Sequence, residues 1–159
     1  MTNQFYAKGG QFYLNGKPQF IQAGEFHYFR TSPDQWENRL TLLKQAGFNA
    51  VASYIPWRWH QVEEGVSDFD GHSHPLRNLT GFLDLAASMG LYIIVRPGPY
   101  IMAETTHEGI PDWVFTRYPQ VVFISQDGKP QNVVSYLHPE FQACVKQWYQ
   151  AVFQVLAPR

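Results

Sequence analysis

Three segments of the sequence combine aromatic rings with side chains that can ionise or hydrogen-bond. They are residues 25–30, 54–60 and 96–104. Aromatic faces stack on the C–H groups of sugar rings, and carboxylates and amides hydrogen-bond to sugar hydroxyls. The three segments therefore have the composition of a carbohydrate-binding site.

Within these segments, Glu104 and Tyr54 are the candidate ligand-binding side chains. Glu104 follows a stretch with two prolines and a glycine, where a preorganised carboxylate could accept hydrogen bonds from a ligand; the alternative is a solvated loop glutamate. Tyr54 ends an expected strand, where its hydroxyl could donate to a ligand or its ring could pack. Glu25 and Arg96 would face the interior of a barrel, and we expect them to form a structural ion pair because buried charges need partners.

Histidine and cysteine residues do not indicate a metal or cofactor site. His72 and His74 form an H-x-H pattern and His107 lies next to Glu108, but neither has a convincing third or fourth ligand nearby in the sequence. We expect no metal and no cofactor. Cys144 is the single cysteine, which excludes an internal disulfide, and we expect it to fill the core.

The elements that must position these residues alternate between strand and helix. Ser32 is predicted to cap a helix that has Pro33 at its first position and Gln35 completing a capping box. Gly47 and Gly90 are expected to end two helices, each followed by a buried strand. The expected elements are a β-hairpin in residues 4–18, strands at 19–27, 48–55 and 91–95, helices from Ser32 to Gly47, at 76–89 and at 139–155, and a turn at 125–130.

This alternation predicts an α/β fold with right-handed βαβ units and a parallel sheet. Three such units are too few to close a barrel, because a (β/α)8 TIM barrel needs about 200 residues or more. We therefore interpret residues 1–18 as an N-terminal β-hairpin and residues 19–159 as the first three βα units of an incomplete TIM-barrel catalytic domain. The alternative is a small three-layer domain whose open sheet edge pairs with another chain.

Charge and hydropathy exclude several classes of partner. The chain has 12 Lys and Arg against 13 Asp and Glu, a formal net charge of −1. It therefore lacks the excess of positive charge that would attract nucleic acid or an anionic membrane. No apolar run approaches the ~20 residues of a membrane span. The N-terminus shows no signal peptide. We expect no nucleic-acid and no membrane partner and a cytoplasmic location, and we leave a homo-oligomer open.

Taken in order along the chain, the motifs resemble glycoside hydrolase family 35, the β-galactosidase family. The resemblance implies a (β/α)8 barrel and a retaining mechanism in which two glutamates, about 5 Å apart, act as acid/base and nucleophile. In that family the two glutamates come from the ends of the fourth and seventh strands, so no catalytic residue is assigned here. The motifs are residues 24–30 (GEFHYFR), Trp36, 54–60 (YIPWRWH), 68–71 (DFDG), 96–100 (RPGPY), 103–104 (AE) and 109–113 (GIPDW).

Matched residue by residue, the resemblance assigns four substrate-binding positions. Tyr54 matches the family's galactose-contacting tyrosine and Glu104 its sugar-hydroxyl-binding glutamate. Met102 and Ala103 match the adjacent positions that line the same subsite. Met102 stands where the family usually has Cys or Asn, and Glu108 stands at the first glycine of its Gly-Gly-x-Pro stretch. These departures leave the exact sugar open, because the family also includes exo-glucosaminidases.

Three hypotheses about function follow. In the first, the whole protein hydrolyses terminal non-reducing β-D-galactose or a related β-glycoside, and this chain supplies part of the sugar-binding subsite and is inactive alone. In the second, the chain is a truncated product that binds sugar without catalysis. In the third, it is a fragment that self-associates through its unpaired sheet edge. Turnover of a chromogenic galactoside that is lost in Glu104→Gln would contradict the second, and a stable monomer would contradict the third.

Overall fold

The chain begins with a three-stranded antiparallel meander. The computed structural model describes residues 4–158, and strands β1 (Phe5–Lys8), β2 (Gln11–Leu14) and β3 (Lys17–Gln19) pair in that order. The predicted hairpin covers β1 and β2, and the structure adds β3. The left-handed Asn15-Gly16 turn, with φ of 53° and 78°, returns the chain at once into a strand.

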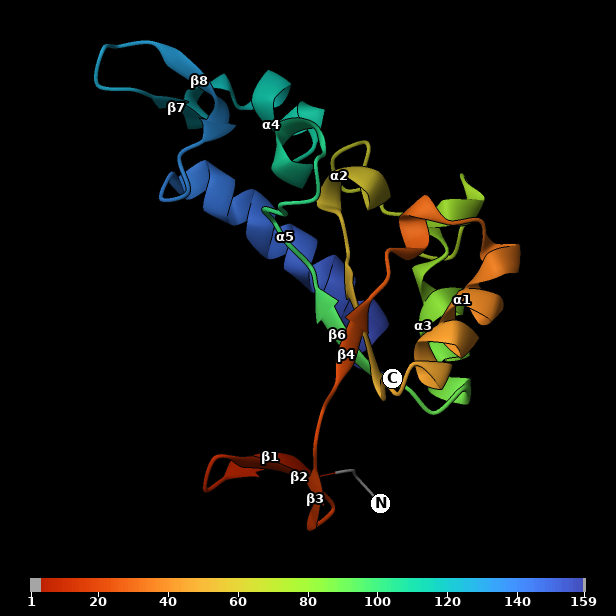
Figure 1. The fold of residues 1–159 in the computed structure, drawn as a ribbon. Helices are drawn as coiled ribbons and strands as arrows, with labels where there is room; N and C mark the ends of the chain where they lie inside the picture. The colour runs from red at the N-terminus through yellow and green to blue at the C-terminus, as the bar shows by residue number, and fades with distance from the viewer. Residues whose placement is uncertain (1–3, 159) are drawn as a thin grey trace.

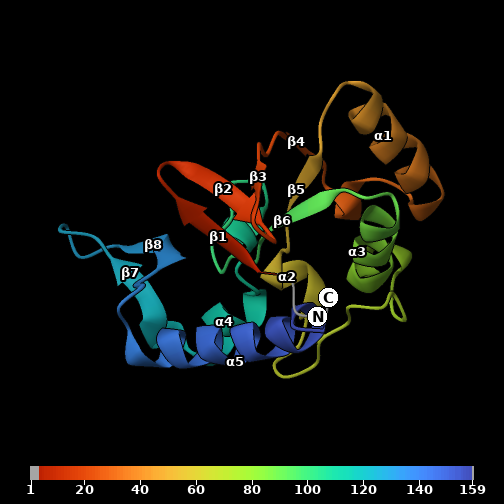
Figure 2. The ribbon, with the colours of Figure 1, turned by 90° about the horizontal axis from the view of Figure 1, so that it is seen from below.

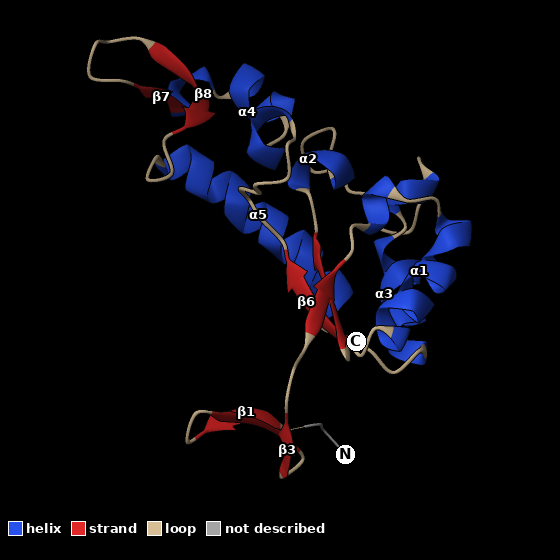
Figure 3. Ribbon diagram, in the orientation of Figure 1, coloured by secondary structure: helices blue, strands red, loops and turns tan. Residues whose placement is uncertain are grey.

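A second sheet carries the three parallel strands that were expected. Strands β4 (Ala23–Glu25), β5 (Ala50–Tyr54) and β6 (Tyr92–Arg96) lie in that order. The predicted strand at 19–27 is too long, because the side-chain amide of Asn49 bonds the backbone before β4. Its Nδ2 donates to the Phe20 carbonyl at 2.6 Å, and its Oδ1 accepts from the Gln22 N–H at 2.8 Å. Figure 3 shows the meander beyond one end of this parallel sheet.

Three longer helices cover the parallel sheet, and each buries one apolar face. They are α1 (Pro33–Gln45), α3 (Leu79–Ser88) and α5 (Pro139–Leu156). Helices α1 and α3 lie side by side, and α5 lies apart from them (Figures 1 and 2). The buried positions are Trp36 and Leu40 in α1, Leu79, Phe82, Leu83 and Ala86 in α3, and Phe141, Cys144, Trp148 and Val152 in α5.

Short elements fill the segments whose sequence shows no periodic pattern. None of them spans enough residues to show a helical or strand repeat, so their geometry depends on what they pack against. Among residues 4–158, no helix is both long and apolar enough to cross a membrane. The short elements are α2 (Trp57–His60), α4 (Asp112–Arg117), the 3-10 turns η1 (Tyr28–Arg30), η2 (Pro75–Arg77), η3 (Thr106–Gly109) and η4 (Pro119–Val121), and the hairpin of β7 (Val122–Ile124) and β8 (Pro130–Val134).

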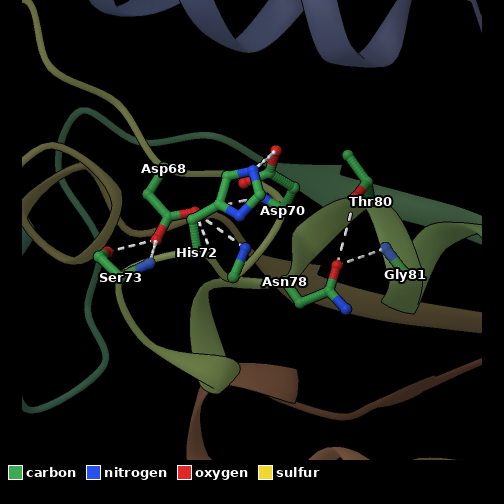
Figure 4. Close-up of polar contacts among 8 residues, drawn as sticks. Asp68, Asp70, His72, Ser73, Asn78, Thr80 and Gly81 are labelled. Carbon is green, nitrogen blue, oxygen red and sulfur yellow. Dashed lines mark hydrogen bonds and ion pairs between the residues drawn. The ribbon is translucent and has the colours of Figure 1, made fainter.

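The helix starts differ from the sequence prediction. Asn78 caps α3: its Oδ1 accepts from the Gly81 N–H at 2.9 Å (Figure 4), which starts the helix at Leu79 rather than at residue 76. The predicted capping box of α1 is wrong, because the Ser32 hydroxyl makes no bond to the helix backbone and donates instead to the Asp34 carboxylate.

This difference between the two caps gives a stability prediction. We expect Asn78→Ala to lower the free energy of unfolding by about 1 kcal/mol, because the partly buried N–H of Gly81 loses its acceptor. Ser32→Ala is the matched control and should change it by less than about 0.5 kcal/mol, since no cap bond is lost. Urea unfolding followed by circular dichroism measures both. Equal losses in the two variants would contradict the assignment of the caps.

Candidate functional site

The three parallel strands point their carboxyl ends toward the end of the molecule opposite the meander (Figure 1). Glu25 ends β4, Tyr54 ends β5 and Arg96 ends β6, and the register pairs Tyr54 with Arg96 across neighbouring strands. Ligands in parallel α/β folds bind at this end of the strands. All three segments singled out from the sequence therefore meet at one place.

An ion pair joins the outer two strands across this end. Arg96 Nη2 lies 2.5 Å from Glu25 Oε1, and the Arg96 guanidinium stands over the Tyr54 ring at 3.8 Å from its centroid. The expected Glu25–Arg96 pair is confirmed. Because it also covers one face of Tyr54, the pair fixes that ring in a half-buried position.

The ring of His27 completes this cluster, although no sequence motif marked this residue as a candidate for ligand binding. The ring stacks on Tyr54 and on Phe29, with centroids 5.5 and 5.1 Å away. Burial lowers the pKa of His27, and this effect outweighs the opposing charge of Glu25. Its only signal in the sequence was its place within residues 24–30.

The contacts of His27 define its hydrogen-bonding state. His27 Nε2 lies 3.1 Å from Glu25 Oε1. A carboxylate only accepts hydrogen bonds, so the neutral ring carries its hydrogen on Nε2. His27 Nδ1 is buried and has no partner among the described residues. This nitrogen is therefore enclosed within the cluster.

The loop after β6 holds Glu104 in an unusual conformation. Trp148 Nε1 donates to the Pro97 carbonyl at 2.6 Å, the Tyr149 hydroxyl donates to the Gly98 carbonyl at 2.7 Å, and Arg30 donates to the Ala103 carbonyl. Glu104 itself has a left-handed φ of 45°, a conformation that costs a non-glycine residue about 1 kcal/mol or more. Strain of this kind is retained where the side chain is needed in a particular direction.

The four substrate-binding positions predicted by the resemblance differ in exposure. Glu104 and Met102 are exposed, whereas Ala103 is only 2% exposed and meets its surroundings through its carbonyl. Tyr54 lies in the cluster with His27 and Arg96. Glu104 lines a cavity together with Phe29, and His27 stacks on Phe29, so the two groups lie at the same end of the sheet.

The cavity that Glu104 lines has a volume of about 410 Å³. An ion pair between α2 and α4 lies in this lining: Arg58 Nη2 is 2.5 Å from Asp112 Oδ2, and His107 Nδ1 is 2.9 Å from Asp112 Oδ1. The hydrogen bond from Arg58 lowers the pKa of Asp112. The lining residues are Phe29, Arg30, Pro56, Arg58, Trp59, Val62, Arg77, Ile101, Glu104, Thr105, Pro111 and Asp112.

The loop that contains His72 and His74 is held together by hydrogen bonds to a carboxylate. The Asp68 carboxylate accepts from four backbone N–H groups between Asp70 and Ser73 (Figure 4). Burial raises the pKa of Asp68, but the bonds from Ser73 and the backbone outweigh it and hold that pKa well below its usual range. His72 lies 3.1 Å from Asp70. Within the described part of the chain, no three His, Cys, Asp or Glu side chains are grouped to hold a metal ion.

Comparison with known proteins places this chain in a family. The model of glycosyl hydrolases family 35 matches residues 11–159. The chain is 41% identical over 153 residues to an exo-beta-D-glucosaminidase of Thermococcus kodakarensis, covering 93% of this chain and 20% of that protein. It is 42% identical over 149 residues to a beta-1,2-glucosyltransferase of Ignavibacterium album (92% and 21%) and 33% identical over 148 residues to a beta-galactosidase of Mus musculus (93% and 20%). The chain spans about a fifth of these relatives.

Two solved glycosidases share the fold. The crystal structure of a beta-galactosidase from the psychrophilic Marinomonas ef1 matches with a TM-score of 0.65 at 14% identity, over 80% of this chain and 18% of that chain. The exo-beta-1,4-mannosidase Op5Man5 from Opitutaceae bacterium strain TAV5 matches with a TM-score of 0.62 at 19% identity, over 99% of this chain and 26% of that chain. The parallel βαβ arrangement described above is thus shared with part of each of these enzymes.

Proposed function

The chain belongs to glycosyl hydrolases family 35, and from this premise we propose that it forms part of the sugar-binding site of a β-glycosidase. The whole protein would hydrolyse terminal non-reducing β-D-galactose or a related β-glycoside. Residues 19–159 would be the first three βα units of a (β/α)8 barrel, preceded by the N-terminal strands.

The observation that carries this proposal is that Tyr54 ends β5 in contact with His27, while Glu104 lines a cavity together with Phe29, on which His27 also stacks. Glu104, which is exposed, would accept hydrogen bonds from sugar hydroxyls. Met102 and Ala103 would line the same subsite. Charge-assisted hydrogen bonds of this kind are about twice as strong as neutral ones, so Glu104 would contribute most.

Bond cleavage would use two glutamates from other strands of the barrel. One protonates the leaving oxygen and the other attacks the anomeric carbon, and water then hydrolyses the glycosyl-enzyme with retention of configuration. The residues described here would hold the terminal sugar in position for that pair. Such positioning lowers the activation barrier of hydrolysis only when the sugar is held in a reactive geometry.

The test is hydrolysis of p-nitrophenyl β-D-galactoside, β-D-glucosaminide and β-D-glucoside by the protein expressed from its whole gene. We expect turnover of at least one of them, with the β-anomer released first as seen by NMR. Residues 1–159 expressed alone should bind sugar without turnover. A well-folded whole-gene product that hydrolyses none of the three would contradict the proposal.

A further inference from the structure

The cavity that Glu104 lines carries more positive than negative charge. Three arginines, Arg30, Arg58 and Arg77, line it, with the two acidic residues Glu104 and Asp112. Asp112 is already paired with Arg58. Within residues 4–158, neither Arg30 nor Arg77 has a carboxylate partner: Arg30 donates to the Ala103 carbonyl and Arg77 to the Ser73 hydroxyl.

Protein contacts hold these guanidiniums in place. The Arg77 guanidinium lies over the Trp59 ring at 5.0 Å, and its Nη1 is 2.6 Å from Ser73 Oγ. The planar guanidinium fork matches the oxygens of a carboxylate or a sulfate, and an immobilised one loses little freedom on binding. The cavity is therefore lined by two arginines, Arg30 and Arg77, that are held by protein contacts and have no carboxylate partner among the described residues.

The same cavity has apolar surface for a sugar ring. Trp59 and Phe29 line it, and the Trp59 indole is fixed by a 3.1 Å hydrogen bond from Nε1 to the Leu76 carbonyl. Its volume of about 410 Å³ lies within the ~300–1,000 Å³ of small-molecule sites. Rings, a carboxylate and unpaired guanidiniums are thus combined in one site.

We propose that this cavity binds an acidic saccharide, that is, a sugar unit carrying a carboxylate or a sulfate. The anion contacts Arg77 and Arg30, and hydroxyls of the same ligand contact Glu104. The inference rests on the proposed function in one respect: the acidic unit lies beside the terminal sugar held by Glu104, so the preferred substrates are β-glycosides with an acidic group near the cleaved bond.

Calorimetric titration of the whole-gene product with four probes tests this inference. The probes are D-glucuronate, D-glucose 6-sulfate, neutral D-glucose and inorganic sulfate. We expect at least one acidic sugar to bind about tenfold or more tightly than glucose, with the advantage shrinking as NaCl is added. The better of the two acidic sugars identifies the anion. Equal affinity for glucose and both acidic sugars would overturn the inference, and so would inorganic sulfate binding as tightly as the acidic sugars.

Variants locate the binding in the cavity. Arg77→Gln and Arg30→Gln should each remove most of the tenfold preference, because each deletes one guanidinium that faces the anion. Arg117→Gln is the matched control: its guanidinium pairs with Glu64, at 2.5 Å, outside the cavity lining, and the preference should remain. Two cavity variants keep the test decisive if one of them does not fold. A preference that survives in both folded variants would overturn the proposal.

A failure of the acidic-saccharide site can be distinguished from a failure of the proposed glycosidase function. Glycoside hydrolysis is measured on the same preparations. Hydrolysis without any preference for acidic sugars would leave the glycosidase proposal standing and overturn the acidic-saccharide site. An arginine-dependent preference without hydrolysis would support the site and contradict the glycosidase proposal.

Discussion

Glu104→Gln is expected to lower kcat/KM for the best p-nitrophenyl β-glycoside by about 100-fold, equivalent to ~3 kcal/mol of transition-state stabilisation. The substitution keeps the size of the side chain but removes the charge that would accept hydrogen bonds from sugar hydroxyls. The loop itself should persist, because its backbone is held by Arg30, Trp148 and Tyr149 rather than by the Glu104 side chain.

Two further variants separate binding from loop structure. Glu108→Gln is the matched control, since Glu108 lies in the same loop with a similar φ of 51° but outside the cavity lining; we expect kcat/KM within about twofold of the wild type. Glu104→Gly should lose activity as Glu104→Gln does while raising the free energy of unfolding by up to about 1 kcal/mol, because glycine relieves the left-handed strain. Full activity in Glu104→Gln would remove Glu104 from the sugar site.

Stability should fall steeply below pH 6.5 because of His60. This side chain is 1% exposed, its Nδ1–H donates to the Asp68 carbonyl at 2.6 Å, and its Nε2 accepts from the Tyr28 hydroxyl at 2.5 Å. Burial lowers the pKa of His60 to about 4, so the folded protein holds it neutral. In the unfolded chain this side chain binds a proton near pH 6.5. The contribution of neutral His60 to the free energy of unfolding is therefore fully present above pH 6.5. It is lost as the pH falls toward 4, by about 3 kcal/mol in all.

Urea unfolding at pH 7 and pH 4.5 measures this loss. The wild type should lose about 2–3 kcal/mol more than His60→Gln between the two pH values, because the variant has no imidazole to protonate. His60→Gln will itself be less stable at pH 7, so the comparison uses the pH dependence of each protein. His72→Gln, at an exposed ring, is the control and should keep the wild-type pH dependence. The same pH dependence in all three proteins would contradict the role of His60.

Much of the fold could be predicted because the long elements have repeating patterns. The spacing of Phe82, Leu83 and Ala86 defines the buried face of α3 without reference to any other element. The glycines after α1 and α3, with φ of 92° and 73° at Gly47 and Gly90, end those helices as expected. Predictions of helix caps were less reliable where several groups compete for one hydrogen bond. Ser32 is an example, because its hydroxyl bonds Asp34 instead of the helix backbone.

By itself the sequence determined the family, the alternation of strands and helices, and which residues follow the strands, because these features are local or are carried by ordered motifs. Only the tertiary structure decided where those residues point. It stacked His27 on Tyr54, turned Glu104 into a left-handed backbone and gathered Arg30, Arg58 and Arg77 around one cavity. Each of these depends on contacts between distant segments, such as the bond from Arg30 to the Ala103 carbonyl, 73 residues away. Such contacts form only when the strands pair and the loops at their ends are packed together, and no local pattern encodes them.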